Sequence, residues 1–139
     1  MIDHVSIAVS DLERSRRFYS KLLEPLGLTV LAEKPGTFGF GKKYPEFWIN
    51  LRSDMPPVET DSGIHICLRA SSVEAVKAFF AAATEAGGST EEEPQSWPQY
   101  HARYFAAFVR DPDGNRIEAV HFVAPDAEDG EPAGQSNPA

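Results

Sequence analysis

The stretch Asp3-His4-Val5-Ser6-Ile7-Ala8-Val9-Ser10 returns 61 residues later as Ile64-His65-Ile66-Cys67-Leu68-Arg69-Ala70-Ser71. Histidine meets histidine near the head of both copies. Self-similarity at a fixed offset indicates two copies of one structural unit, which has to be recognised before any single element is interpreted. The match continues without a gap through Phe18 and Phe79, Glu24 and Glu85, and Gly27 and Gly88.

The first copy predicts one strand, one helix and three further strands. Val5, Ile7 and Val9 alternate with more polar residues, which is typical of a strand with one buried face. Ser10 or Asp11 then offers an N-cap, and the following helix ends at Pro25 and Gly27. The three strand-favouring runs after it are Leu28–Glu33, Thr37–Gly41 and Phe47–Arg52.

The second copy predicts the same order after a proline-stiffened linker, Met55–Asp61. Ser71 or Ser72 caps its helix, and Gly87 and Gly88 end it. The predicted segments are a strand Ile64–Arg69, a helix to about Ala86, a strand Ser89–Glu93, a loop Pro94–Gln99, a strand Arg103–Arg110, a turn Asp111–Gly114 and a strand Asn115–Phe122.

These elements predict an α+β fold of two tandem β-α-β-β-β modules within one domain. The chain has 139 residues, a usual size for a single domain. We place the domain at 1–123, with module one at 1–54 and module two at 62–123. Residues 124–139 contain almost nothing to bury and are predicted to be a disordered acidic tail.

Composition limits the partners and the compartment. A formal net charge of −8 argues against nucleic acid or anionic lipid, because both are bound by Lys and Arg clusters. No apolar run reaches the roughly 20 residues of a membrane span, and no secretory leader is visible. Cys67 is the single cysteine, which fits a reducing compartment. We therefore expect a cytoplasmic protein with a small-molecule substrate.

The repeat also brings metal-ligating residue types into matching positions. Late in the two copies, Ile49-Asn50-Leu51 matches Ile117-Glu118-Ala119 at an offset of 68. If the modules pack about a pseudo-twofold axis, His4, Asn50, His65 and Glu118 are expected to converge on that axis. His4, His65 and Glu118 are the ligand types of a facial site with two histidines and one carboxylate. A surface or core histidine is the simpler explanation for each one alone, but their matched positions favour metal.

Two motifs carry a family resemblance. Asp3–Leu12 with Phe18 and Tyr19, and Asp111-Pro112-Asp113-Gly114-Asn115-Arg116-Ile117-Glu118, resemble the vicinal oxygen chelate superfamily of glyoxalases, extradiol dioxygenases and bleomycin-resistance proteins. The resemblance covers about residues 2–123 and implies a single-domain member with a cupped mixed sheet, a half-barrel, around a divalent metal. It implies His4, His65 and Glu118 as metal ligands, and Fe, Mn, Ni, Co or Zn as the ion.

The resemblance also implies candidate catalytic residues. Glu118 is one of them, and Asn50 stands where glyoxalase I relatives usually place Glu, although Asn has no useful acid–base chemistry at neutral pH. Tyr104 and His101 are the candidates for the additional Tyr and His that extradiol enzymes use near the metal. Relatives of this size often form homodimers, and modules exchanged between subunits would build the site from two chains.

The function expected is that of a metal-dependent lyase, isomerase or dioxygenase acting on a substrate with vicinal oxygens. The alternative is a metal-free small-molecule binding protein that resembles bleomycin-resistance proteins, with Trp48 and Trp97 as aromatic contacts. Arg52 and Arg103 are candidates to bind a carboxylate or phosphate with two hydrogen bonds. Arg116 shares a strand face with Glu118, as its ion partner or as a solvated neighbour. A structural or solvated role is favoured for all three arginines.

Four further residues receive structural interpretations. Asp111 and Asp113 are assigned to their turn, Cys67 is interpreted as a buried inert thiol, and His121 is placed on the strand face opposite Glu118.

Overall fold

The computed structural model describes residues 1–125, so residues 126–139 of the predicted tail lie outside the described part. Both modules show the predicted β-α-β-β-β order, which confirms the α+β fold class. Module one contains β1 (Val5–Val9), α1 (Leu12–Leu23), the 3-10 helix η1 (Glu24–Leu26), β2 (Thr29–Lys34), β3 (Thr37–Gly41) and β4 (Pro45–Leu51). Module two contains β5 (Ile66–Arg69), α2 (Val73–Glu85), β6 (Ser89–Ser96), β7 (Tyr104–Arg110) and β8 (Arg116–Phe122).

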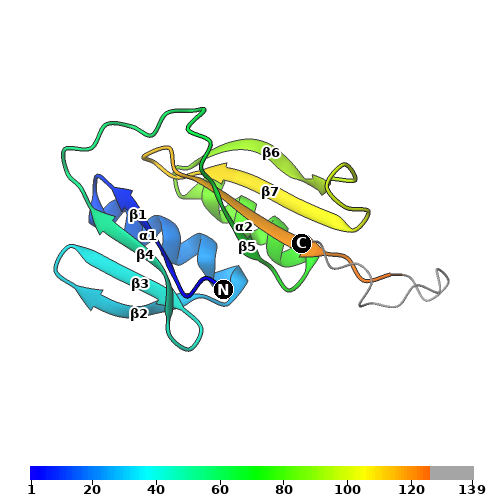
Figure 1. Cartoon of the computed structure of the whole chain (residues 1–139), viewed down its shortest axis with the longest axis horizontal. Coiled ribbons are helices and arrows are strands. Elements are labelled where there is room, and N and C mark those ends of the chain that lie inside the picture. Colours follow the sequence, from blue (N-terminus) through cyan, green and yellow to red (C-terminus); the bar gives the residue numbers. More distant parts are fainter. Residues whose placement is uncertain (126–139) are drawn as a thin grey trace.

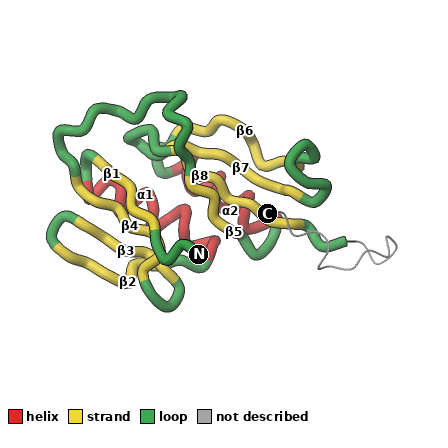
Figure 2. The backbone as a smooth tube through the Cα atoms, viewed as in Figure 1, coloured by secondary structure: helices red, strands yellow, loops and turns green. Residues whose placement is uncertain are grey.

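Each module forms its own four-stranded mixed sheet. The strand order is β1-β4-β3-β2 in sheet A and β5-β8-β7-β6 in sheet B. The first strand of each module pairs in parallel with the last strand, and the other pairs are antiparallel. Both helices lie behind the sheets in the view of Figure 1, so they cover one face of each sheet and leave the other face open. Figure 2 shows the long loop that joins β4 to β5.

Local signals set the ends of both helices. The Asp11 side chain accepts from the backbone N–H of Arg14 at 3.0 Å, and the Ser72 hydroxyl accepts from that of Ala75 at 3.0 Å. Past η1, Gly27 adopts a φ of +82°, a left-handed conformation that favours glycine. No helix within residues 1–125 is long and apolar enough to cross a membrane.

One hydrophobic core joins the two modules. α1 packs against α2, and the buried Phe18 and Leu22 of α1 share a cluster with Val76 and Phe79 of α2. At Gly88 a Cβ would lie 2.6 Å from the Phe18 ring, so the glycine permits a close approach between the modules. The modules are therefore packed together through their helices.

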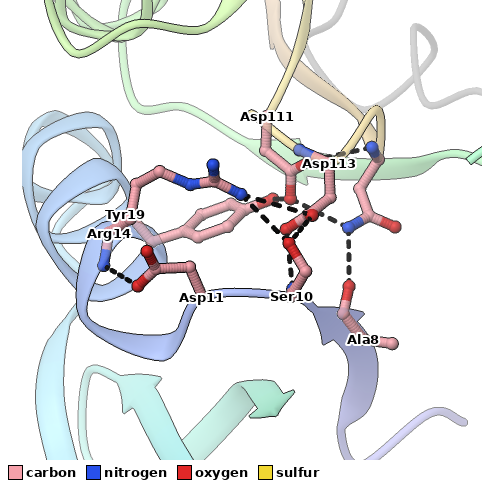
Figure 3. Close-up of polar contacts among 8 residues, drawn as sticks. Ala8, Ser10, Asp11, Arg14, Tyr19, Asp111 and Asp113 are labelled. Atoms are coloured by element: carbon pink, nitrogen blue, oxygen red, sulfur yellow. Dashed lines mark hydrogen bonds and ion pairs between the residues drawn. The ribbon is translucent and has the colours of Figure 1, made fainter. Parts of the chain in front are cut away.

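A buried polar cluster adds a second connection between the modules (Figure 3). Asp113, in the turn between β7 and β8, accepts hydrogen bonds from the backbone N–H of Ser10 at 3.0 Å and from the Ser10 hydroxyl. Arg14 forms an ion pair with the same carboxylate at 3.3 Å. The turn of module two is thereby attached to the start of α1.

Asp111 extends this cluster. Its Oδ1 accepts from the backbone N–H groups of Asp113 and Asn115, as a turn aspartate does, while its Oδ2 accepts from the Tyr19 hydroxyl at 2.6 Å. Burial raises the pKa of Asp111 above 3.8 and the pKa of Tyr19 above its usual range. Assigning Asp111 and Asp113 to turn geometry was therefore correct but incomplete, because both also bind module one.

Strand β6 is longer than the sequence predicted. It runs to Ser96 and includes Pro94, which the sequence assigned to a loop. β6 lies at the edge of sheet B, and its pairing with β7 is interrupted between Glu92 and Gln95. A proline is tolerated there because its missing N–H breaks no regular ladder bond.

Candidate functional site

Glu118 is a buried carboxylate on the open face of sheet B. In the strand register it lies beside Cys67 of β5 and Phe108 of β7. Its side chain is only 2% exposed. His65 directly precedes β5, and its Nε2 lies 3.0 Å from Oε1 of Glu118. Parallel pairing of β5 with β8 thus brings together two of the predicted metal ligands.

Tyr104 holds the other oxygen of the same carboxylate. Its hydroxyl donates a hydrogen bond to Oε2 of Glu118. Burial, followed by this hydrogen bond, raises the pKa of Tyr104 well above the usual value. Tyr104 is therefore a neutral donor that positions Glu118 across the neutral pH range.

A cavity of about 500 Å³ opens beside these three residues. Phe108 forms part of its floor, and the Trp97 ring lies edge-on to Phe108 at 5.3 Å. Trp97 also stacks on Tyr100 at 5.7 Å. The full lining consists of His65, Gln99, Tyr100, Tyr104, Phe108, Arg116 and Glu118.

Gln99, Phe108 and Arg116 also line the cavity, and sequence reasoning gave none of them a role in the site. Arg116 was placed on the strand face of Glu118, and period-two alternation could have placed Phe108 on the cavity face too, because it lies at an even spacing from Tyr104. Gln99 reaches the cavity from the loop between β6 and β7, and no sequence signal marked it.

Cys67 differs from its sequence interpretation in one respect. The residue is exposed rather than buried, because it stands on the open face of β5. Its sulfur lies 4.0 Å from the Tyr104 hydroxyl. Partial desolvation of the sulfur, followed by the nearby Glu118 charge, raises the pKa of Cys67 to about 12. A thiol with so high a pKa carries little thiolate at neutral pH.

His101 and His121 lie apart from the cavity lining. His101 accepts from the backbone N–H of Arg103 at 3.1 Å and packs edge-on against Phe122. His121 lies 3.0 Å from the carbonyl oxygen of Ala70, on the face opposite Glu118 as predicted. The structure thus places Tyr104, and not His101, beside Glu118.

His4 does not join the pair within one chain. It precedes β1 in sheet A, is 54% exposed at its side chain, and contacts Asp3 at 2.7 Å. Within residues 1–125, no group of three His, Cys, Asp or Glu side chains is arranged to hold a metal ion. The predicted convergence of His4, Asn50, His65 and Glu118 is therefore not formed by the single chain, in which each module keeps its own sheet.

The strand register also corrects the predicted match between Asn50 and Glu118. Ser6 and Cys67 are equivalent in the repeat; Ser6 pairs with Trp48, whereas Cys67 pairs with Glu118. Trp48 is thus the counterpart of Glu118, and Asn50 lies two residues further along β4. Asn50 instead accepts a hydrogen bond from the Thr37 hydroxyl at 2.6 Å.

The residues present are compatible with a divalent metal. A histidine nitrogen and a carboxylate oxygen lie 3.0 Å apart at the wall of a cavity. The carboxylate is buried and its second oxygen is held by Tyr104, the kind of outer contact that orients metal ligands. One further ligand would complete a facial set of three.

Comparison with known proteins identifies relatives of the whole domain. The family model of the Glyoxalase/Bleomycin resistance protein/Dioxygenase superfamily matches residues 1–119. A probable lactoylglutathione lyase of Synechocystis sp. is 31% identical over 125 residues, which cover 84% of this chain and 92% of that protein.

Solved structures agree with this relationship. A glyoxalase/bleomycin resistance protein from Albidiferax ferrireducens T118 is 35% identical with a TM-score of 0.74, covering 87% of this chain and 98% of that chain. A glyoxalase-related enzyme from Fulvimarina pelagi, 19% identical with a TM-score of 0.66, covers 94% and 95% and shares the fold. By sequence and by structure, the chain belongs to the Glyoxalase/Bleomycin resistance protein/Dioxygenase superfamily.

Proposed function

We propose that the protein is a divalent-metal-dependent enzyme that acts on a small substrate with vicinal oxygens. The observation that carries the proposal is the pair of His65 and buried Glu118 at the wall of the cavity, with Tyr104 holding the second carboxylate oxygen. Membership of a superfamily that includes lyases and dioxygenases supports it.

A divalent ion held by His65 and Glu118 would supply Lewis-acid chemistry, stabilising negative charge on two vicinal substrate oxygens. The chain's own residues prepare the site for this. Tyr104 keeps the Glu118 carboxylate in one orientation, because it remains protonated and donates to Oε2. Phe108 and Tyr100 line one side of the cavity with aromatic surface, and Trp97 packs against both rings.

We propose that a second copy of the chain supplies the third ligand, His4. The single chain leaves His4 exposed and apart from the His65–Glu118 pair. The open faces of both sheets leave room for a partner, and symmetric dimers are the commonest oligomers. In such a homodimer each site would combine His4 of one subunit with His65 and Glu118 of the other.

The register of β4 favours a reaction that uses one carboxylate. Trp48 stands at the position equivalent to Glu118, so module one offers no matching acid. A mechanism with two acid–base carboxylates at the metal is therefore disfavoured. Glu118, with Tyr104 as neutral donor, is left as the proton-transferring group of the site.

The first test measures metal content after equal exposure of each variant to Fe(II), Mn, Co, Ni and Zn. Wild-type protein is expected to bind close to one ion per chain, and His65→Ala and Glu118→Gln to lose most of it. His101→Ala is the matched control, since His101 lies outside the cavity lining. Absence of metal from folded wild-type protein would contradict the proposal and favour a metal-free binding protein.

A mixing experiment tests the shared site separately. His4→Ala and His65→Ala are each expected to bind little metal alone. After unfolding and refolding together, mixed dimers should contain one intact site, restoring about a quarter of wild-type metal binding. Failure of mixing to restore metal, while the variants form mixed dimers, would contradict the shared site.

A further inference from the structure

The open face of sheet B carries a cationic group that the proposed reaction does not use. Arg116 precedes Glu118 by two residues on β8, so both side chains lie on the same face. Arg116 and His65 line the cavity at Glu118 and also a neighbouring cavity of about 370 Å³. Arg116 therefore stands where the two cavities meet.

Two contacts hold the Arg116 guanidinium in place. Its central carbon lies 4.3 Å from the centre of the Phe108 ring, and its Nε donates to Glu91 at 3.1 Å. Within residues 1–125 neither terminal amino group of Arg116 makes a hydrogen bond. The group is thus oriented by stacking and by one bond, while its two outer donors remain available.

Arg110, on the neighbouring strand, shows the opposite pattern. It forms an ion pair with the same Glu91 carboxylate and donates to the carbonyl oxygens of Gly114 at 3.0 Å and Thr60 at 2.8 Å. Its donors bind the chain itself, which is a structural role. One carboxylate, Glu91, therefore pairs with two guanidinium groups, so the positive charge of Arg116 is only partly neutralised.

One other acid lines the neighbouring cavity. Asp61 is exposed, and among the described residues it forms no ion pair with Arg110 or Arg116. An exposed carboxylate is well solvated and screens Arg116 only weakly. The outer donors of Arg116 are therefore the positive group that a ligand in the two cavities would meet.

We infer that Arg116 binds an oxyanion of the substrate, so that the substrate is a small acid. A guanidinium fork matches a carboxylate or a phosphate with two parallel hydrogen bonds. Residues two apart on a strand are separated by about 7 Å, which a short carbon chain can span. Vicinal oxygens would face His65 and Glu118 while the anionic end reaches Arg116; this part rests on the proposed function.

The test compares ligands that differ only in the anionic end. 2-Oxoglutarate is paired with 2-oxovalerate, and dihydroxyacetone phosphate with dihydroxyacetone. Dissociation constants are measured by calorimetry for wild type, Arg116→Gln, Arg116→Lys and the charge-matched control Arg52→Gln. Arg52 is exposed, and within residues 1–125 its side chain donates only to the carbonyl oxygen of its neighbour Leu51.

Wild type is expected to bind the member with the additional anionic end group (2-oxoglutarate or dihydroxyacetone phosphate) about tenfold more tightly or better in at least one pair, a typical gain for a charge-assisted pair. Arg116→Gln should abolish this preference, Arg116→Lys should keep part of it, and Arg52→Gln should leave it unchanged. A preference within the carboxylate pair alone or the phosphate pair alone identifies the source of the oxyanion.

Equal affinities within both pairs, or no binding of either member, would overturn the inference, as would full preference in Arg116→Gln. Titrations are run with and without added metal, and metal content is measured in the same samples. Loss of anion preference with metal retained supports the role of Arg116. If wild type binds no metal, the proposed function fails, and the metal-free titrations still decide the role of Arg116.

Discussion

The two modules share a scaffold, and their open faces differ. On sheet B, Glu118 is buried between Phe108 and Cys67 beside a cavity. On sheet A, the equivalent position holds Trp48, and a Cβ at Gly39 would lie 2.9 Å from its ring. One module therefore offers a carboxylate and the other an indole lying against its sheet. The two copies therefore share the residues that pack against the helices and differ in the residues on their open faces.

The shared scaffold gives the largest expected effect. Phe18 and Phe79 occupy matching places in the repeat and are 1% and 0% exposed. Phe18→Ala and Phe79→Ala should each lower the free energy of unfolding by about 3–5 kcal/mol, because each leaves a cavity in the same core. Urea unfolding measures both. A cost below about 1 kcal/mol for one variant would show that the two helices do not contribute equally.

The polar cluster between the modules breaks their symmetry and gives an intermediate effect. Asp113 accepts from Ser10 and Arg14 across the module boundary. Asp113→Ala should lower the free energy of unfolding by about 1.5–3 kcal/mol, the usual cost of losing hydrogen bonds to a charged group. Asp113→Asn is the matched control and should cost less. Equal stability of Asp113→Ala and wild type in urea would show that the cluster contributes nothing.

The smallest expected effect is on the alkylation rate of a thiol, measured at equivalent positions on the open faces of the two sheets. Its repeat partner is Ser6, so the double variant Ser6→Cys, Cys67→Ala carries a single thiol on sheet A. With a Cys67 pKa of about 12, alkylation of the metal-free wild type should keep accelerating up to about pH 12, since only the thiolate reacts. The rate of the double variant should be half-maximal near pH 8.5 and level off about one pH unit higher.

Glu118→Gln sharpens this comparison, because it removes one of the causes of the raised Cys67 pKa. It should speed alkylation of Cys67 at pH 8. Levelling of the wild-type rate below pH 9.5 would contradict the proposed effect of desolvation and of Glu118 on the thiol.

Part of the candidate site could be predicted from the sequence. His65 directly precedes β5, and Glu118 lies in β8, the parallel neighbour of β5 in the same module. The repeat drew attention to both residues. The family resemblance made Tyr104 a candidate, and the antiparallel pairing of β7 with β8 places it four pairs from Phe108 and Glu118, on the same face. Local periodicity and short connections were sufficient for His65 and Glu118.

The remainder depended on interactions between distant segments. The offset of 68 matched Asn50 with Glu118. In the sheets, however, Ser6 pairs with Trp48 as its repeat equivalent Cys67 pairs with Glu118. The true counterpart of Glu118 is therefore two residues before Asn50, on the same strand face. A shift of two leaves the alternation of apolar residues unchanged, so periodicity cannot detect it. In the same way, turn chemistry explained Asp111 and Asp113 locally and concealed their bonds to Tyr19 and Ser10.

The duplicated module, the order of its elements and the caps of its helices follow from period, offset and neighbouring residues, so they can be predicted from the amino-acid sequence. Three features come from long-range packing: α1 packs against α2, each module keeps its own sheet, and His4 lies away from His65 and Glu118. Those outcomes depend on which faces of the two modules bury each other. That choice is made by the packing of the whole core around residues such as Phe18 and Gly88, and no local pattern encodes it.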